Sequence, residues 1–274
     1  MRRLRERTWL AGTALVAMIL FCALWPEVAP FGHNYVDFDL SRQGPSLAHP
    51  LGTDQYGRDL LTRLAAAGRV SLAITGLALA IVLAVGFVYG AVAALAGGRL
   101  DAALMRVLDG LLALPRLPVS IIVIVALNQS AMTIWAVVLA LAIVSWMLTA
   151  RLVRGHVLVL REAEFIRAAR AVGARRRRIV FRHVLPNTLG VLVVAVLLEL
   201  PGVILGEAFL SFIGLGISPP DASWGAMAQE GRTTYRTHPI EIVVPSVAIA
   251  SLVLCANFIA DGLRDALDPR TREN

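Results

Sequence analysis

Four ionisable residues stand inside long apolar stretches of this 274-residue chain: Asp109, Arg116, Glu199 and Glu207. Charged groups at membrane depth are costly, and they face a bundle interior or a water-filled path. Asp109 and Arg116 are seven residues apart, about 10 Å along one helical face, so we expect pairing with other helices in preference to substrate contact. For Glu199 and Glu207, a packing role and contact with a solute's amino group or cation in a pore stay equally open.

Motifs for enzyme chemistry are missing from the sequence. It contains no HExxH, no CxxC and no GxSxG, and because it has no lysine it cannot form a GxxxxGK[ST] phosphate loop. Cys22 and Cys255 both fall in apolar stretches, where a reduced thiol behaves as a small hydrophobe. We therefore predict no catalytic residue, no metal site and no cofactor bound by this chain, so that any energy must come from another protein.

The composition indicates a membrane protein. Hydrophobic residues make up 57% of the chain and charged residues 16%, and the mean hydropathy is +0.71. A membrane span needs about 20 mostly apolar residues, and six stretches qualify if the third may carry its charges. They are residues 9–25, 70–96, 107–127, 132–150, 189–215 and 240–260. The basic start and apolar run also suit a signal peptide, but the run is long and lacks a clean cleavage site, which favours a retained first helix.

The arginines predict the orientation of these six spans. The formal net charge is +7, and all its positive side chains are arginines. Six crossings place the N-terminus, the loop near residues 99–106, residues 151–187 and the C-terminus on one side, which holds most of the arginines. By the positive-inside rule this side is the cytoplasm. Both termini are therefore expected to be cytoplasmic.

The most basic stretch is residues 161–187, REAEFIRAARAVGARRRRIVFRHVLPN. Its first part is amphipathic at helical spacing, with one face formed by Phe165, Ile166, Ala169 and Val172. Gly173 is placed to end this helix in a left-handed turn. A second short helix would then lead to Pro186, which suits the first turn of the next span. We predict a compact pair of short helices.

The residues of this pair are compatible with three interpretations. A basic helix pair can bind nucleic acid, but a loop tethered at both ends to membrane spans has little room to enter a groove. It can also lie on anionic lipid as a positive anchor. The third interpretation is a helix docked into a groove of a soluble partner. The small side chains of Ala168 and Ala169, with Gly173, favour close docking over lipid contact.

The same segment resembles a known family. AARAVG followed after nine residues by HVLP resembles the EAA loop of permease subunits of bacterial ABC importers, and its surroundings are similar to the branch that serves dipeptides, oligopeptides and nickel. Further stretches agree with that branch: HPLGTDQYGRDLLTRL, MRVLDGLLALP, EAFLSFIGLGISPPDASWGAM and DGLRDALDPR. The resemblance covers nearly the whole chain. It implies an all-α type I permease fold with an N-terminal helix and extracytoplasmic loop (1–68), a permease domain (69–264) and a cytoplasmic tail (265–274).

The resemblance also implies partners and a coupling loop. The partners would be a second homologous permease subunit, two ATP-binding subunits that hold ATP and Mg²⁺, an extracytoplasmic substrate-binding protein and the lipid bilayer of the bacterial inner membrane, with no nucleic acid. The coupling residues would be Glu164, Phe165, Arg167, Ala168, Ala169, Gly173, Leu185 and Pro186. Arg167 stands where the family motif has Glu, and His183 where it has Ile.

The implied function is half of the translocation pore of an ATP-driven peptide importer working by alternating access. Alternatives are a family member that imports nickel, glutathione or another small solute, a secondary transporter without an ATPase, and a membrane scaffold. Outside the membrane, Thr53 or Asp54 is expected to cap a helix before Leu60. Residues 26–69 suit either a surface helix or contact with a binding protein. The segment broken by Pro219 and Pro220 is expected to fold back into the outer mouth as a gate or a dock.

Overall fold

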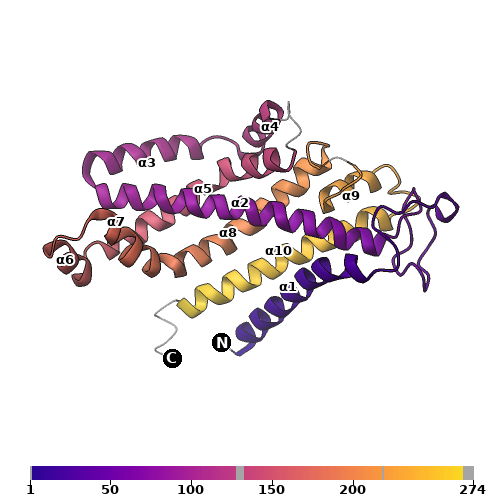
Figure 1. Ribbon diagram of the computed structural model, residues 1–274, viewed down its shortest axis with the longest axis horizontal. Coiled ribbons are helices and arrows are strands. Elements are labelled where there is room, and N and C mark those ends of the chain that lie inside the picture. Colours follow the sequence, from indigo (N-terminus) through magenta and orange to yellow (C-terminus); the bar gives the residue numbers. More distant parts are fainter. Residues whose placement is uncertain (1, 128–132, 218, 268–274) are drawn as a thin grey trace.

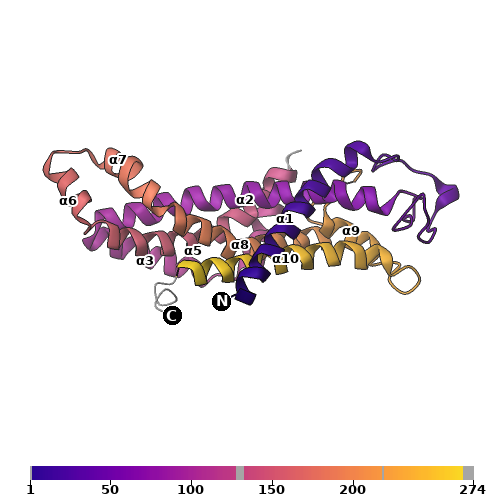
Figure 2. The same ribbon diagram turned by 90° about the horizontal axis from the view of Figure 1, so that it is seen from below.

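The computed structural model describes residues 2–127, 133–217 and 219–267, and its regular elements there are helical, apart from an isolated bridge between Thr53 and Asp59. Five long apolar helices can cross a membrane: α1 (Arg2–Val28), α2 (Leu60–Ala96), α5 (Thr133–Leu160), α8 (Leu185–Phe212) and α10 (Ile240–Leu267). They run along one long axis (Figures 1 and 2). Met132, where the fourth span was expected to begin, and residues 268–274 of the expected tail lie outside the described residues.

The third expected span is not one straight helix. α3 (Gly98–Leu112) and α4 (Arg116–Leu127) meet at an angle of 88°. Pro115 lies in the break, where it lacks an N–H and disfavours helical geometry in the residue before it. If the bent pair counts as one span, the chain has six. The expectation that Asp109 and Arg116 share one helical face is therefore wrong, because the bend separates them.

α2 lies at the centre of the bundle and packs most closely against α5. Gly86 and Gly90 form a GxxxG pair on α2. A Cβ atom on Gly86 would collide with Thr149, and one on Gly90 with the backbone at Ala150. Small residues at this spacing allow two helix backbones to approach in a membrane, where dispersion contacts drive packing. The core beside this contact joins α2, α4, α5 and α8 through Ile74, Ile124, Val137, Val203 and Leu210.

α1 and α10 lie side by side along the lower edge of the bundle in Figure 1. A second core cluster connects them to α2, α8 and the short helix α9 (Trp224–Gly231). Its largest member is Trp224, whose indole N–H donates to the carbonyl oxygen of Leu64 at 3.0 Å. α9 therefore folds back onto the bundle, as expected for the segment after Pro219 and Pro220.

The two ends of the bundle differ in what they carry. One end, here named the α9 end, holds α9 and residues 29–59, which include the short helix η1 (Phe38–Leu40). The opposite end, the α6 end, holds α6 (Glu164–Ala171), α7 (Arg176–Ile179) and the π-helical turn η2 (Val180–Val184). The first residues of α1 and the last of α10 point toward the α6 end (Figure 1). The start of α1 and the end of α10 are thus directed toward the same end of the bundle as the basic segment.

Candidate functional site

The short helix α6 ends in the glycine turn that the sequence predicts. Gly173 has a φ of +81°, in the left-handed region that glycine adopts without strain. The N–H of Ala174 donates to the carbonyl oxygen of Ala169 at 3.0 Å, the bond of a Schellman cap. The chain then enters α7, which continues through η2 into α8. The second short helix is therefore joined directly to a membrane span, with Pro186 in its first turn.

Three apolar residues fix this helix pair to the bundle. Ile166, Ile179 and Val184 are buried in one cluster, whose other members are Phe87, Ala91, Ala94, Val153 and Val157. Arg161 adds a polar contact, because its Nη1 donates to the carbonyl oxygen of Ala94 in the last turn of α2 at 2.9 Å. A displacement of the pair would therefore act directly on α2, α5 and α8.

The face offered to a partner differs from the predicted one. Ile166, placed by the sequence on the docking face, is fully buried against the bundle. Phe165 and Val172 are 44% and 85% exposed. Phe165 and Ile166 are adjacent apolar residues of α6, and tertiary packing decides that Ile166 is the one that faces α2 and α5. The other expected coupling residues divide as follows: Glu164, Arg167, Ala168, Gly173 and Pro186 are exposed, and Ala169 and Leu185 are half-buried.

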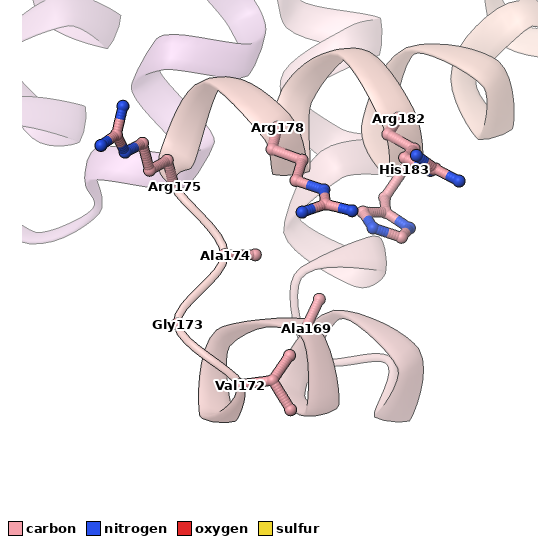
Figure 3. Close-up of a pocket in the computed structure, with 8 residues that line it drawn as sticks. All are labelled: Ala169, Val172, Gly173, Ala174, Arg175, Arg178, Arg182 and His183. Carbon is pink, nitrogen blue, oxygen red and sulfur yellow. The ribbon is translucent and has the colours of Figure 1, made fainter.

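A pocket of about 520 Å³ lies between α6 and the α7–η2 segment. It is lined by Ala169, Val172, Gly173, Ala174, Arg175, Arg178, Arg182 and His183 (Figure 3). Arg178 and His183 point from the α7–η2 wall toward α6, whereas Arg175 turns away (Figure 3). No carboxylate is among the residues that line this pocket.

Asp109 and Arg116 each pair with a charge on another helix. Asp109 accepts a hydrogen bond from Arg151 of α5. Nearby, both carboxylate oxygens of Asp101 accept from Arg154, at 2.6 and 2.7 Å, so that two ion pairs join α3 to α5. Such two-point arginine–carboxylate pairs fix geometry as well as charge.

Arg116 lies at the start of α4 and reaches across to α8. Its Nη1 donates to Oε2 of Glu199 at 3.5 Å. The second oxygen of this carboxylate, Oε1, is buried without a hydrogen-bond partner in the described structure. The Arg116 side chain is about half exposed, whereas that of Glu199 is buried. Glu199 thus has one acceptor that is not used inside the chain.

Glu207, by contrast, is fully satisfied within the chain. Its carboxylate accepts from the hydroxyl of Ser71 at 3.1 Å and from that of Ser211 at 2.8 Å. The Ser71 oxygen in turn accepts from the backbone N–H of Trp224 at 3.0 Å. Glu207 is buried at the centre of these bonds and connects α8 to α2 and, through Ser71, to α9.

A network of buried charges holds the α9 end together. Arg58 donates to the carboxylate of Glu230 on α9 at 3.0 Å, and Arg63 donates to both oxygens of the same carboxylate at 2.8 and 2.9 Å. Arg58 also donates to Asp54 at 2.6 Å. Arg58 and Arg63 are nearly inaccessible to solvent. The network therefore locks the loop before α2 onto α9.

The cap of α2 is Asp59, so the expectation of Thr53 or Asp54 is wrong. Oδ2 of Asp59 accepts from the backbone N–H of Thr62 at 2.8 Å, and its Oδ1 lies 3.0 Å from Nδ1 of His49. The carboxylate of Asp54 instead accepts from the N–H groups of Tyr56 and Arg58 within the preceding turn.

Several of these residues carry no local signal in the sequence that identifies their partners. Glu230 is separated from its partners by 167 and 172 positions, and no local pattern connects residues so far apart. Arg151 and Arg154 were counted only as positive charges, although their spacing of three places them on one helical face. Arg178 and Arg182 have the related spacing of four, which could have indicated a shared ligand.

Comparisons with known proteins give consistent results. The family described as "binding-protein-dependent transport system inner membrane component" matches residues 76–273. The oligopeptide transport system permease protein OppC of Haemophilus influenzae is 38% identical over 99% of this chain and 87% of its own length. The dipeptide transport system permease protein DppC of Bacillus subtilis is 37% identical over 99% and 85% of the two chains.

Among solved structures, the MetNI methionine ABC transporter in an inward-facing conformation contains a similar chain. The TM-score is 0.59 at 20% identity, and the match covers 75% of this chain and 96% of that one. This likeness is one of fold. It confirms the predicted all-α architecture of a type I importer permease.

Proposed function

Because the chain belongs to the family of binding-protein-dependent transport system inner membrane components, we propose that it is a pore-forming permease subunit of an ATP-driven peptide importer. The multi-pass bundle of apolar helices supplies the membrane part. The choice of peptides as cargo rests on relatives named for oligopeptide and dipeptide transport, which match the chain over almost its full length.

The observation that carries the proposal is the way in which the α6–α7 pair is mounted. It is fixed to three membrane helices through buried Ile166 and Val184, yet it presents Phe165 and Val172 to solvent. Exposed large apolar groups beside a rigid mount suit a docking element. An ATP-binding subunit seated on this face can move α2, α5 and α8 without contacting the membrane.

The proposed orientation places the α6 end in the cytoplasm and the α9 end outside. Residues 161–187 carry eight arginines and two glutamates, a net charge of +6 for the segment alone, and the positive-inside rule assigns such a segment to the cytoplasm. Both termini then lie inside. Two ATP-binding subunits, which hold ATP and Mg²⁺, would meet the α6 end, a second permease subunit would complete the pore, and a substrate-binding protein would meet the α9 end.

We assign different roles to the charged residues within the membrane-spanning helices. Arg116 and Glu199 connect the bend between α3 and α4 to α8, and Glu199 keeps one free acceptor. We assign this pair to the pathway, where a shift between α4 and α8 during alternating access would expose the carboxylate to a peptide's amino group. We assign Glu207 to packing, because both of its oxygens are bonded inside the chain.

The test is uptake of labelled dipeptide and oligopeptide into proteoliposomes. The chain is reconstituted with a second permease subunit, ATP-binding subunits and a substrate-binding protein from the same organism. We expect uptake only with the whole set and with ATP on the α6 side. Uptake by this chain alone in an ion gradient would instead identify a secondary transporter, and binding without flux would identify a scaffold. Uptake of Ni²⁺ or glutathione in place of peptide would support an importer but refute the assignment of peptides as its cargo.

A further inference from the structure

We propose that the pocket between α6 and α7–η2 receives an aspartate or glutamate side chain of the ATP-binding subunit. This inference rests on the proposed function, since it names the chemistry by which that partner is recognised. The pocket is distinct from the exposed apolar face formed by Phe165 and Val172, although Val172 lies at the edge of both.

The first support is the balance of charge around the pocket. Arg178 and Arg182 line it together with His183, and in the described part of the chain neither arginine forms an ion pair. The nearest acidic residues by sequence are Glu164, which is exposed on α6 and does not line the pocket, and Glu162, which is bonded to Arg161 at 2.9 Å. The cations of the pocket are thus left for a group from outside.

The second support is shape. Apart from Val172 at its edge, the wall formed by α6 and its turn consists of the small groups Ala169, Gly173 and Ala174. No heavy atom lies within 4 Å of the position that a Cβ atom on Gly173 would take, so the turn leaves open space. A volume of about 520 Å³ is ample for one acidic side chain and water. Arg178 and Arg182 are one turn apart, a spacing that lets two guanidinium groups approach one carboxylate.

The third support separates a protein side chain from a lipid headgroup, which offers similar anionic chemistry. Ala169 of α6 and Val172 of the turn after α6 both line the pocket, so a partner that covers Val172 also closes the pocket. α6 is the part of the chain farthest from the α9 end along the long axis (Figures 1 and 2). A soluble subunit reaches that position more directly than a headgroup tethered to the bilayer.

The proposed occupant of the pocket predicts a charge-specific effect of a substitution at Ala169. Ala169→Glu places a carboxylate in the pocket from within, next to Arg178 and His183, and so competes with the partner's side chain. Ala169→Gln has the same size without the charge. We therefore expect Ala169→Glu to lower recovery of the ATP-binding subunit at least fivefold more than Ala169→Gln.

The decisive experiment uses the absence of lysine from the chain. Arg178→Lys keeps the positive charge and introduces a unique side-chain amine. A carbodiimide joins an amine to a carboxylate in direct contact: an amide bond forms, and the water lost converts the carbodiimide to its urea. The control is Arg177→Lys, because Arg177 is the neighbouring exposed arginine, lies over the ring of Phe181 and does not line the pocket.

We expect the assembled transporter with Arg178→Lys to give a covalent product in which mass spectrometry finds residue 178 linked to an Asp or Glu of the ATP-binding subunit. The yield should exceed that of Arg177→Lys about fivefold or more, in line with a contact that favours one carboxylate over bulk solution by about 1 kcal/mol. Equal yields would overturn the proposal. The proposal would also be overturned if no cross-linked product forms although a water-soluble acylating reagent modifies the new amine in the isolated chain.

Failure of this inference can be told apart from failure of the proposed function. If the wild-type chain recovers the ATP-binding subunit but Arg178→Lys gives no linkage, the pocket assignment alone fails. If the wild-type chain recovers no such subunit, the function fails. A lipid ligand is tested with Arg178→Glu in nanodiscs that contain equal amounts of phosphatidylglycerol and phosphatidylcholine. If this variant retains less phosphatidylglycerol than the wild type but still binds the ATP-binding subunit, the pocket binds lipid and the proposal is refuted.

Discussion

The arginine side chains at the two ends of the bundle differ in burial and in ion pairing. At the α9 end, Arg58 and Arg63 are buried and bonded to Asp54 and Glu230 of the same chain. At the α6 end, Arg178 and Arg182 are exposed, and no ion pair engages them in the described part of the chain. A buried cation must be paired within the protein, because the loss of its hydration is otherwise uncompensated. A solvated one is available to a partner.

This difference indicates which end is complete within one chain. The α9 end pairs its buried Arg58 and Arg63 within the chain and packs Trp224 into the core, so its shape is set before any partner binds. The α6 end has a fixed mount but an open surface. Three predictions test this contrast, and a fourth concerns the middle of the bundle.

The largest effect is expected at the α9 end from Glu230→Gln. The amide leaves two buried arginines with only Asp54, and removal of one partner from a buried ion network costs about 3 kcal/mol. The measurement is thermal unfolding of the purified chain together with proteolysis of residues 29–59. Glu27→Gln is the matched control, because Glu27 pairs with Arg69 at 2.8 Å on the surface and should cost less than about 1 kcal/mol. Equal costs would remove the contrast.

At the α6 end, Val172→Glu should leave the fold intact and weaken docking. Val172 is 85% exposed, so the free chain can keep the carboxylate hydrated. At a covered interface, the loss should be about 2 kcal/mol, or roughly thirtyfold in affinity for the ATP-binding subunit. Co-purification at graded subunit concentrations measures this change, and Val172→Ala is the control. Unchanged affinity together with normal transport would exclude α6 as a docking helix.

Gly173→Val tests the turn rather than the surface. A β-branched residue at a φ of +81° is strained by about 1–2 kcal/mol, although nothing blocks the side chain itself. We expect the ATP-binding subunit to stay bound while ATP hydrolysis becomes less dependent on substrate. Gly173→Asn, which tolerates the left-handed region, should behave almost as wild type. If valine and asparagine give the same coupling, the turn geometry does not matter.

The smallest effect concerns the middle of the bundle. Glu199→Gln removes the charge that faces Arg116, and we expect peptide uptake to fall about fivefold, equivalent to about 1 kcal/mol, with assembly intact. Glu207→Gln should change uptake less, because the serine hydroxyls can bond to an amide as well as to a carboxylate. Uptake assays with assembly checked by size-exclusion chromatography decide between them. The reverse order would exchange the roles of the two residues.

The sequence predicted those features that depend on local chemistry. Apolar length located the spans, and Gly173 in its basic context located the turn. The sequence did not predict which apolar side chains are buried where tertiary packing decides between neighbours. Ile166 and Phe165 are equally apolar neighbours, and only contact with α2 and α5 decides which of them is buried.

The bend at Pro115 and the network at Glu230 show two other limits. Apolar residues continue on both sides of Pro115, so the pattern read as one span although the proline was visible. Glu230 meets Arg58 and Arg63 across more than 160 positions, and neither charge nor spacing connects them before the chain is folded.

The docking of an ATP-binding subunit at the α6 end is tested most directly by the accessibility of Val172, in the turn that follows α6. Val172→Cys is made in a chain whose Cys22 and Cys255 are replaced by serine, with Leu47→Cys as the exposed control at the α9 end. The measurement is labelling by a membrane-impermeant thiol reagent.

We predict that Leu47→Cys is labelled in intact cells and Val172→Cys is not. In inside-out vesicles, Val172→Cys should be labelled once the ATP-binding subunits are stripped off and protected when they are restored. Labelling of Val172→Cys in intact cells, or equal labelling with and without those subunits, would contradict this prediction.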